Sequence, residues 1–377
     1  MNRLDMESDV SSAKRSDLFS KISLVLVSPC PPPVGGMTHW TELITSALRN
    51  RDDLEMTLVD SSLGIPAGQR TMAQKIFGML GVVRRGLAAI GPTYCEGKVL
   101  HICTSGGYGF LRDYLLAMYA KKRGVPSCVH MHFGRIPDIL QSRSVESLLL
   151  KKVLSVSNVI VTMDQGSFDA LNQSSLARNV VNVPNPIAIE RFDEPACKEE
   201  SAIFVGHVYK AKGVEVLLEA WRSFQVDHPS WNLDIVGPIE DGYKKQLRCA
   251  SEGLSVAFLG EMSHDAVLDR ISRASILVLP SFSEGFPNVI LEAMSRKTVA
   301  IGSPVGAISE MLDNDKRLLV PCGAHSLLAE AMSYIADNPQ EALLIGEQLY
   351  SRTVQLYSVD SVVEKLLGIW EKLLIEG

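Results

Sequence analysis

Residues 280–294, PSFSEGFPNVILEAM, mark the point where a buried strand should end and a helix should begin. The apolar run at 276–279 precedes them, and the serines, glycine, proline and asparagine that follow are turn formers. Pro287 suits the first helical position, where its missing N–H costs nothing, and apolar residues at 289, 290, 293 and 294 recur at helical spacing. The stretch therefore predicts strand, glycine loop and helix, the unit from which doubly wound α/β sheets are built.

The backbone amides of this stretch are candidates for binding phosphate. Those of Gly285, Phe286 and Asn288 are expected to lie unpaired at the positive end of the helix. Glu284 precedes that end and Glu292 lies roughly 7 Å further along the helix axis, so the two are not expected to share a proton. We expect them to hold opposite ends of a ligand whose middle is anionic. The alternative is an ordinary strand, loop and helix on which Glu292 is solvated.

Length and composition indicate a soluble globular protein. At 377 residues the chain is long enough for two domains, and it is 46% hydrophobic and 21% charged. No apolar run approaches the roughly 20 residues that span a bilayer. Residues 1–20 lack an apolar core segment and are predicted to be a disordered extension. The seven cysteines form no C-x-x-C pair, which predicts reduced thiols in a cytosol and no zinc site.

The charge of the chain is unevenly distributed. The net charge is −6, but the first half carries an excess of Lys and Arg and the second half an excess of Asp and Glu. An acidic whole argues against a nucleic-acid-binding protein, while a basic first half leaves room for an anionic partner there. An ordinary difference between two domains explains the asymmetry equally well.

The first half begins with the predicted strand at 21–28 and the loop PCPPPVGG. Gly35 and Gly36 in this loop would let the backbone approach a ligand, although the G-x-G-x-x-G dinucleotide fingerprint is absent. Further strands are predicted at 56–59, 99–103, 127–132, 158–163 and 180–183. Alternation puts His130 and His132 on one face of their strand. His132 ends that strand, so we expect it to face the ligand crevice.

Residues 69–90, QRTMAQKIFGMLGVVRRGLAAI, are apolar with four basic side chains, which invites a membrane-surface interpretation. At 100° per residue, however, the bases fall on different sides of a helix, and three glycines weaken it. A core or crevice helix whose bases reach solvent is the preferred interpretation, and membrane contact remains the alternative.

A proline-rich and charged segment, VPNPIAIERFDEPACKEES, predicts the domain boundary. We expect an N-terminal domain at 21–186, a C-terminal domain at 187–359, and an amphipathic helix at 360–377 that packs back on the first domain. The second domain restarts with a strand at 202–205 and the loop GHVYKAKG. His207, Lys210 and Lys212 lie in that loop before a helix, an arrangement suited to phosphate. Solvated lysines in a crossover loop are the alternative. Strands are also predicted at 232–237, 256–260, 276–279 and 298–301.

In these motifs the chain resembles the retaining glycosyltransferases of GT-B fold, specifically glycosyltransferase family 4. The resemblance spans about residues 20–375 and rests on the following stretches, in order: PPPVGG, VHMHFG, FVGHVYKAKGVEVLLEA, VAFLGEMSHDAVLDRISRASILVLPSFSEGFPNVILEAM and GSPVGAISEML. It implies two Rossmann-like doubly wound α/β domains facing across a cleft.

The resemblance also implies roles for individual residues. Lys212 would contact the donor diphosphate, Glu292 the nucleotide ribose and Glu284 the donor sugar, with His132 near the transferred sugar. The donor-binding set it implies consists of Gly35, Gly36, His207, Lys212, Gly285, Phe286, Pro287, Asn288 and Glu292, and the catalytic set of Glu284, His132 and Lys212. No cofactor and no metal are expected, since no D-x-D pair stands at a strand end.

Two positions depart from the family pattern. His207 stands where the family usually has arginine, and a histidine cannot form the bidentate contact that a guanidinium makes with phosphate. Lys212 is therefore expected to be the main cation, with Lys210 as a second. Arg296, Lys297 and Thr298 stand where the family often has a small residue followed by Gly-x-Pro, and the sequence offers no account of them.

The expected function is transfer, with retention of configuration, of a hexose from a UDP- or GDP-sugar to a glycan acceptor that is lipid-linked, in polysaccharide or glycoconjugate biosynthesis. The expected location is the cytoplasm, with peripheral contact of the basic N-terminal domain with the inner membrane face. A UDP-sugar 2-epimerase of the same fold is the main alternative. A nucleotide-binding module without catalysis is a weaker one.

Overall fold

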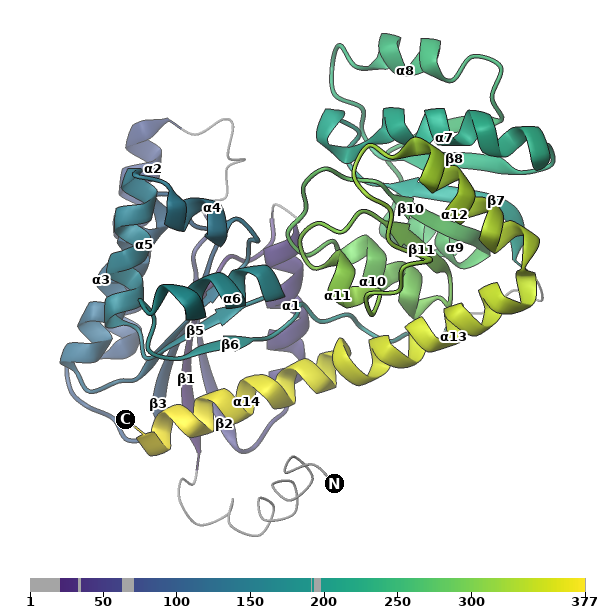
Figure 1. Cartoon of the computed structure of the whole chain (residues 1–377). Coiled ribbons are helices and arrows are strands. Elements are labelled where there is room, and N and C mark those ends of the chain that lie inside the picture. The colour runs from purple at the N-terminus through teal and green to yellow at the C-terminus, as the bar shows by residue number, and fades with distance from the viewer. Residues whose placement is uncertain (1–20, 33–34, 63–70, 191, 193–197, 377) are drawn as a thin grey trace. The chain divides into compact units, whose positions relative to one another are not determined.

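The computed structural model describes residues 21–32, 35–62, 71–190, 192 and 198–376 (Figure 1). The extension expected at 1–20 lies outside this range. The chain divides into two compact units. Unit 1 contains the chain up to Thr162, Phe168–Val183 and the residues from Val363 onward, and unit 2 contains Met163–Ser167 and Pro184–Val362.

Unit 1 is built on a six-stranded sheet in the order β2-β1-β3-β4-β5-β6, with every neighbouring pair parallel. Its strands are β1 (Ile22–Ser28), β2 (Leu54–Asp60), β3 (Lys98–Thr104), β4 (Ser127–Met131), β5 (Val159–Thr162) and β6 (Val180–Asn182). Each coincides with a predicted strand to within two residues at either end. The buried valines, leucines and isoleucines of β1 and β3 explain why these runs form central strands.

Helices cover both faces of this sheet. They are α1 (Gly36–Leu48), α2 (Met72–Ile90), α3 (Gly109–Lys122), α4 (Ile136–Gln141), α5 (Val145–Val156), α6 (Gln165–Ser174) and, from Val363 on, α14 (Val359–Glu376). Helix α3 packs between α2 and α5. Helices α1 and α14 contact strand β3, because Trp40 of α1 and Trp370 of α14 both lie against the ring of His101. The expected amphipathic C-terminal helix is thus present, and its tryptophan is buried in unit 1.

Helix α2 corrects one expectation. Its second half is a core helix, because Val82 and Ile90 are buried and a Cβ at Gly86 would meet Leu116 at 2.6 Å. In its first half, however, Ile76 is 48% and Phe77 is 73% exposed. That half is therefore not a core helix, but Lys75 and Met79 within it line a cavity, in agreement with the crevice alternative of the same prediction. Periodicity reports that a helix has an apolar face and does not report whether a neighbour covers it.

Unit 2 contains a five-stranded parallel sheet in the order β11-β10-β7-β8-β9. Its strands are β7 (Glu199–Val205), β8 (Asn232–Val236), β9 (Val256–Gly260), β10 (Ala274–Leu279) and β11 (Val299–Gly302). Its helices are the 3-10 turn η2 (Lys210–Lys212) followed by α7 (Val214–Asp227), α8 (Lys244–Ala250), α9 (His264–Arg273), α10 (Asn288–Ser295), α11 (Ile308–Met311), α12 (His325–Asp337) and α13 (Pro339–Leu356).

The strand order determines where the candidate site lies in unit 2. Strands β7, β10 and β11 are neighbours and run parallel, so the loops that follow them leave the same edge of the sheet. These loops carry residues 206–213, 280–287 and 303–307, which include most of the predicted site residues. A parallel sheet binds ligands at this edge.

Candidate functional site

Lys212 and Glu284 form the centre of the candidate site in unit 2. The Lys212 ammonium donates to Oε1 of Glu284 at 2.7 Å, and the Ser281 hydroxyl donates to the same oxygen at 2.7 Å. The two side chains are 18% and 9% exposed. The sequence analysis assigned both residues to the same ligand but did not predict that their side chains contact each other. Because they are held together and largely shielded from water, both are oriented before any ligand binds.

Backbone contacts hold the three loops together. The Phe282 amide donates to the Ala211 carbonyl at 2.8 Å, and the Ala307 amide to the Gly285 carbonyl at 2.9 Å. Glycines make these approaches possible. A Cβ at Gly213, whose φ is +70°, would lie 2.1 Å from the Pro280 carbonyl oxygen, and one at Gly306 would lie 2.4 Å from that of Gly285.

We expect Gly213→Ala to lower the free energy of unfolding and to disturb the position of Lys212. The left-handed backbone alone costs about 1–2 kcal/mol for a residue with a Cβ, and the clash with Pro280 adds to it. Urea denaturation measures the loss. Gly242→Ala is the matched control, because Gly242 also has a positive φ of 90° but its Cβ would meet nothing within 4 Å. Equal losses in both variants would contradict the close approach at Gly213.

Helix α10 begins one residue later than the sequence predicts. Pro287, expected at the first helical position, is the N-cap with φ −76° and ψ 106°, and Asn288 opens the helix. Since proline's φ fits both positions, the sequence could not separate them. Among the described residues no acceptor is recorded for the amides of Gly285, Phe286 or Asn288. The positive end of α10 therefore keeps these donors available for an anion.

Glu292 lies further along α10 and is not the solvated residue of the alternative interpretation. Burial raises the pKa of its carboxyl, while His264 and Arg296 act in the opposite direction. A carboxyl of this kind gains from hydrogen-bond donors brought by a ligand, because partial burial has removed some of its water. The hydroxyls of a ribose would be such donors.

His207 lies on the same loop as Lys212 but is exposed, with its ring centroid 5.4 Å from that of Tyr209. Lys210 is exposed as well. Of the three polar residues expected in this loop, the structure thus brings only Lys212 to Glu284. The contribution of His207 to phosphate binding stays a prediction.

The predicted residues of unit 1 lie at the carboxyl edge of its own sheet. Gly35 and Gly36 line a cavity of about 570 Å³. A Cβ on Gly35 would meet no protein atom within 4 Å, so its backbone borders open space. His132 follows β4, and its ring lies 4.9 Å from that of Trp40 between ring centroids. Burial lowers the pKa of His132 to about 3, so its imidazole is neutral near pH 7.

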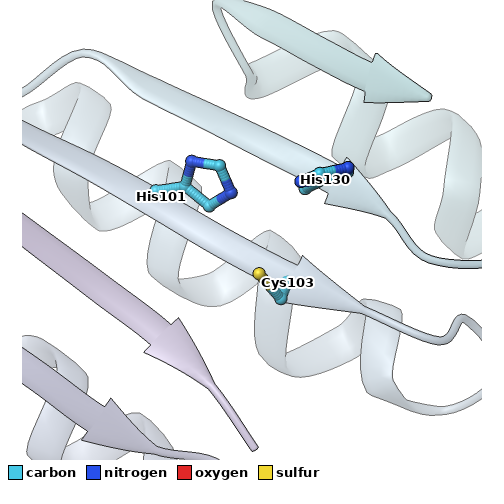
Figure 2. Close-up of side chains that lie close together, drawn as sticks. All are labelled: His101, Cys103 and His130. Atoms are coloured by element: carbon cyan, nitrogen blue, oxygen red, sulfur yellow. The ribbon is translucent and has the colours of Figure 1, made fainter. Parts of the chain in front are cut away.

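Within β3 and β4, before the loops that follow them, lies a buried cluster of three side chains. The sequence singled out only His130 among them. Figure 2 shows His101 and Cys103 on one strand and His130 on the neighbouring strand. Their ligand atoms all lie within 4.8 Å of one another. Burial lowers the pKa of His101 to about 3 and raises that of Cys103 to about 12.

These three residues do not fit a metal ion as they stand. The indole N–H of Trp370 donates to Nδ1 of His101 at 3.1 Å, which places the ring proton on Nε2. A histidine that binds a metal normally donates from its other nitrogen to an acceptor, the reverse of this arrangement. The cluster is therefore interpreted as part of the unit 1 core.

Arg296, Lys297 and Thr298, which depart from the family pattern, each have partners in unit 2. Arg296 is buried, donates to the Glu190 carbonyl at 3.3 Å and covers the Phe192 ring. The Lys297 ammonium lies 2.8 Å from Glu347, and the Thr298 hydroxyl donates to the Ile271 carbonyl at 2.6 Å. All three hold the far end of α10 in place.

Sequence reasoning missed several neighbours of the site. Ser281 was noted only as a turn former, and Asn185, whose amide donates to the Asn288 side chain at 3.4 Å, lies 103 residues away in sequence. Unit 2 has a cavity as well, of about 520 Å³. It lies at the carboxyl ends of β8 and β9 and is lined in part by Lys244 and Arg248. No motif marked it.

Residues 187–352 match the family model described as "Glycosyl transferases group 1". An uncharacterised glycosyltransferase of Haemophilus influenzae is 26% identical over 245 residues, which are 62% of this chain and 65% of the relative. The gpi3 subunit of the phosphatidylinositol N-acetylglucosaminyltransferase of Schizosaccharomyces pombe is 24% identical over 69% of this chain and 58% of its own length. The chain thus spans less than two thirds of these two curated relatives.

Anabaena HepE, crystallised with UDP and glucose, superimposes with a TM-score of 0.69 at 16% identity, over 93% of this chain and all of that one. This likeness shows the GT-B fold, that is, two parallel Rossmann-like sheets. The family match covers the loops that carry Lys212 and Glu284 and the helix that carries Glu292. Residues 187–352 are thus similar to the glycosyl transferases group 1 family, and the chain as a whole has the GT-B fold.

Proposed function

We propose that the protein transfers a hexose from a UDP- or GDP-sugar to a glycan acceptor, with retention of configuration. The observation that carries the proposal is the Lys212–Glu284 pair, 2.7 Å apart at the edge of the unit 2 sheet. Beside it, no acceptor is recorded among the described residues for the amides of Gly285, Phe286 and Asn288. A cation and backbone donors suit a diphosphate, and the carboxylate beside them suits sugar hydroxyls. UDP in the HepE structure supports a nucleotide donor.

In this mechanism the bond between the sugar's anomeric carbon and the diphosphate oxygen breaks while charge grows on the departing diphosphate. Lys212 and the positive end of α10 stabilise that charge, and the leaving diphosphate draws the acceptor's proton. Glu284 orients the donor sugar, and His132 is proposed to act on the transferred sugar. Gly35, Gly36 and His207 complete the proposed donor contacts. We propose that these groups replace a bound metal at the diphosphate.

The test is incubation with a panel of UDP- and GDP-sugars, with and without a membrane extract as acceptor source. Acceptor-dependent release of nucleoside diphosphate supports transfer. Isomerisation of the sugar without release would contradict it. The relatives named above are transferases, so the 2-epimerase alternative is not favoured.

Glu292 is proposed to bind the ribose. We expect Glu292→Ala to weaken donor binding about tenfold or more while kcat falls much less, because ribose contacts are equal in the ground and transition states. Titration with UDP and with GDP measures the affinity. The exposed Glu219 of α7 supplies the control variant Glu219→Ala, which should bind as the parent does. A change in kcat alone would contradict the ribose role.

The acceptor is proposed to be lipid-linked, and the protein to touch the inner membrane face from the cytoplasm. Within the part of the chain that the structure describes, no helix has the length and hydropathy to cross a bilayer. The exposed Ile76, Phe77 and Leu80 of α2 provide an apolar contact. One relative, the gpi3 subunit, belongs to a phosphatidylinositol N-acetylglucosaminyltransferase, which supports a lipid acceptor.

We expect Phe77→Ser to weaken binding to vesicles of phosphatidylcholine with 30% phosphatidylglycerol by about tenfold, since burying a large apolar side chain contributes roughly 1.5–3 kcal/mol. Co-sedimentation measures the bound fraction. Val226→Ser is the control, because Val226 of unit 2 is equally exposed, at 77%. Equal binding by both variants would contradict membrane contact through α2.

A further inference from the structure

The side chain of Ser281 is a buried polar group that contacts the candidate site of unit 2. It is fully buried, and within the described part of the chain the recorded acceptor of its hydroxyl is Oε1 of Glu284, at 2.7 Å. Burying a hydroxyl costs free energy unless it forms a hydrogen bond. The bond to Glu284 therefore stabilises Ser281 in this place, and it also restrains the carboxylate.

The backbone around Ser281 is held by neighbouring loops. The next amide, that of Phe282, donates to the Ala211 carbonyl at 2.8 Å. The Cys322 thiol donates to the carbonyl of Ser281 itself at 3.6 Å. A serine side chain has far fewer rotatable bonds than a glutamate side chain, so Ser281 is the more rigid of the two partners. Its hydroxyl can therefore fix the orientation of the longer Glu284 side chain.

The two carboxylate oxygens of Glu284 have different surroundings. Oε1 accepts from the Lys212 ammonium and from the Ser281 hydroxyl, each at 2.7 Å, whereas no partner of Oε2 is recorded within the described ranges. A carboxylate oxygen has about two acceptor sites, so those of Oε1 are filled and those of Oε2 remain for a ligand. The lysine ammonium is a point charge that attracts either oxygen. The directional hydroxyl of Ser281 is what selects Oε1.

We propose that Ser281 is a positioning residue, which holds Oε1 of Glu284 toward the protein so that Oε2 faces the hydroxyls of the donor sugar. This inference rests on the proposed function and deepens it. Ser281 touches neither the donor nor the reacting atoms in this role. A carboxylate that turns more freely still binds a sugar hydroxyl, but it is less often aligned when the bond to the anomeric carbon breaks. The role therefore affects turnover more than donor binding.

The first test is the steady-state kinetics of Ser281 variants with the nucleotide sugar that turns over in the panel described above. We expect Ser281→Ala to lower kcat about tenfold and to change KM for the donor less than about threefold, because a hydrogen bond to a charged group is lost. Ser281→Cys fills a similar volume but has a weak S–H donor, so it should be as slow. Ser283→Ala is the matched control, because Ser283 lies in the same loop and is exposed.

A double-mutant cycle separates positioning from packing. In the Glu284→Ala background, Ser281→Ala should cause no further loss of kcat, because no carboxylate is left to orient. The same fractional loss in both backgrounds would overturn the proposal, and so would normal turnover of Ser281→Ala or Ser281→Cys.

The same cycle in urea denaturation measures the coupling between Ser281 and Glu284 without any substrate. Coupling is expected there, and its absence would overturn this inference whatever the turnover. Absence of turnover with every nucleotide sugar would instead contradict the proposed function, so the two failures are distinguishable.

Discussion

Replacing Lys212 by alanine is expected to lower kcat about 10²- to 10³-fold, the loss of about 3–4 kcal/mol that follows removal of one preorganised donor to a developing charge. The substitution also leaves Glu284, only 9% exposed, with Ser281 as its remaining recorded side-chain partner. Donor affinity should fall less than kcat, because charge on the diphosphate grows in the transition state. Steady-state kinetics at saturating donor measure the difference.

The matched control is Lys210→Ala, two residues away on the same turn and exposed. It should keep kcat within about threefold. Glu284→Ala should lower kcat as much as Lys212→Ala, and the double variant should lose less than the sum because the two residues act as a pair. Near-normal turnover in both single variants would contradict the assignment of Lys212 and Glu284 to the catalytic site.

Acidification is expected to destabilise unit 1 well before carboxylates titrate. Burial lowers the pKa values of His101 and His132 from 6.5 to about 3, and burial together with the neighbouring His132 and His101 lowers the pKa of His130 well below 6.5. Below pH 6.5 the unfolded chain binds protons that the folded chain does not, so stability falls with falling pH. Each histidine contributes about 1.4 kcal/mol per pH unit, or about 2 kcal/mol between pH 7 and pH 5.

Urea denaturation at pH 7, 6 and 5 measures this dependence. His130→Phe should reduce the slope by about one third if the three histidines contribute equally. His325→Phe, on an exposed residue of unit 2, should leave it unchanged. A slope that is the same in the parent and in His130→Phe would show that the buried histidines do not set the acid limit.

Much of the fold follows from local signals. Short β-branched runs that end in glycine and proline predicted the strands of both sheets, since a buried parallel strand is apolar throughout. The stretch 280–294 predicted a strand, a loop and a helix, and it was in error only on whether Pro287 caps or opens α10. The amides before α10 follow from the same stretch.

The rest depends on contacts that no local pattern encodes. Lys212 and Glu284 are 72 residues apart, and only the order of β7 and β10 brings them together. No local pattern marks His101, because its partner Trp370 lies 269 positions later in the sequence. The indole N–H of Trp370 donates to the His101 ring. Whether the apolar face of α2 is covered depends on which neighbouring elements pack against it, which periodicity does not record. The cavity that Lys75 lines is likewise made by three loops and three helices.

The division of the chain between the units affects the order in which each unit can complete its fold during synthesis. All of unit 2 is translated before α14 supplies Val363 and the residues after it to unit 1. Until then the face of β3 that carries His101 lacks Trp370, and a buried surface of the first unit stays open to water. The N-terminal half of the protein, made first, is therefore finished last, and a nascent chain arrested before α14 would present an unfinished unit to the cell's proteases.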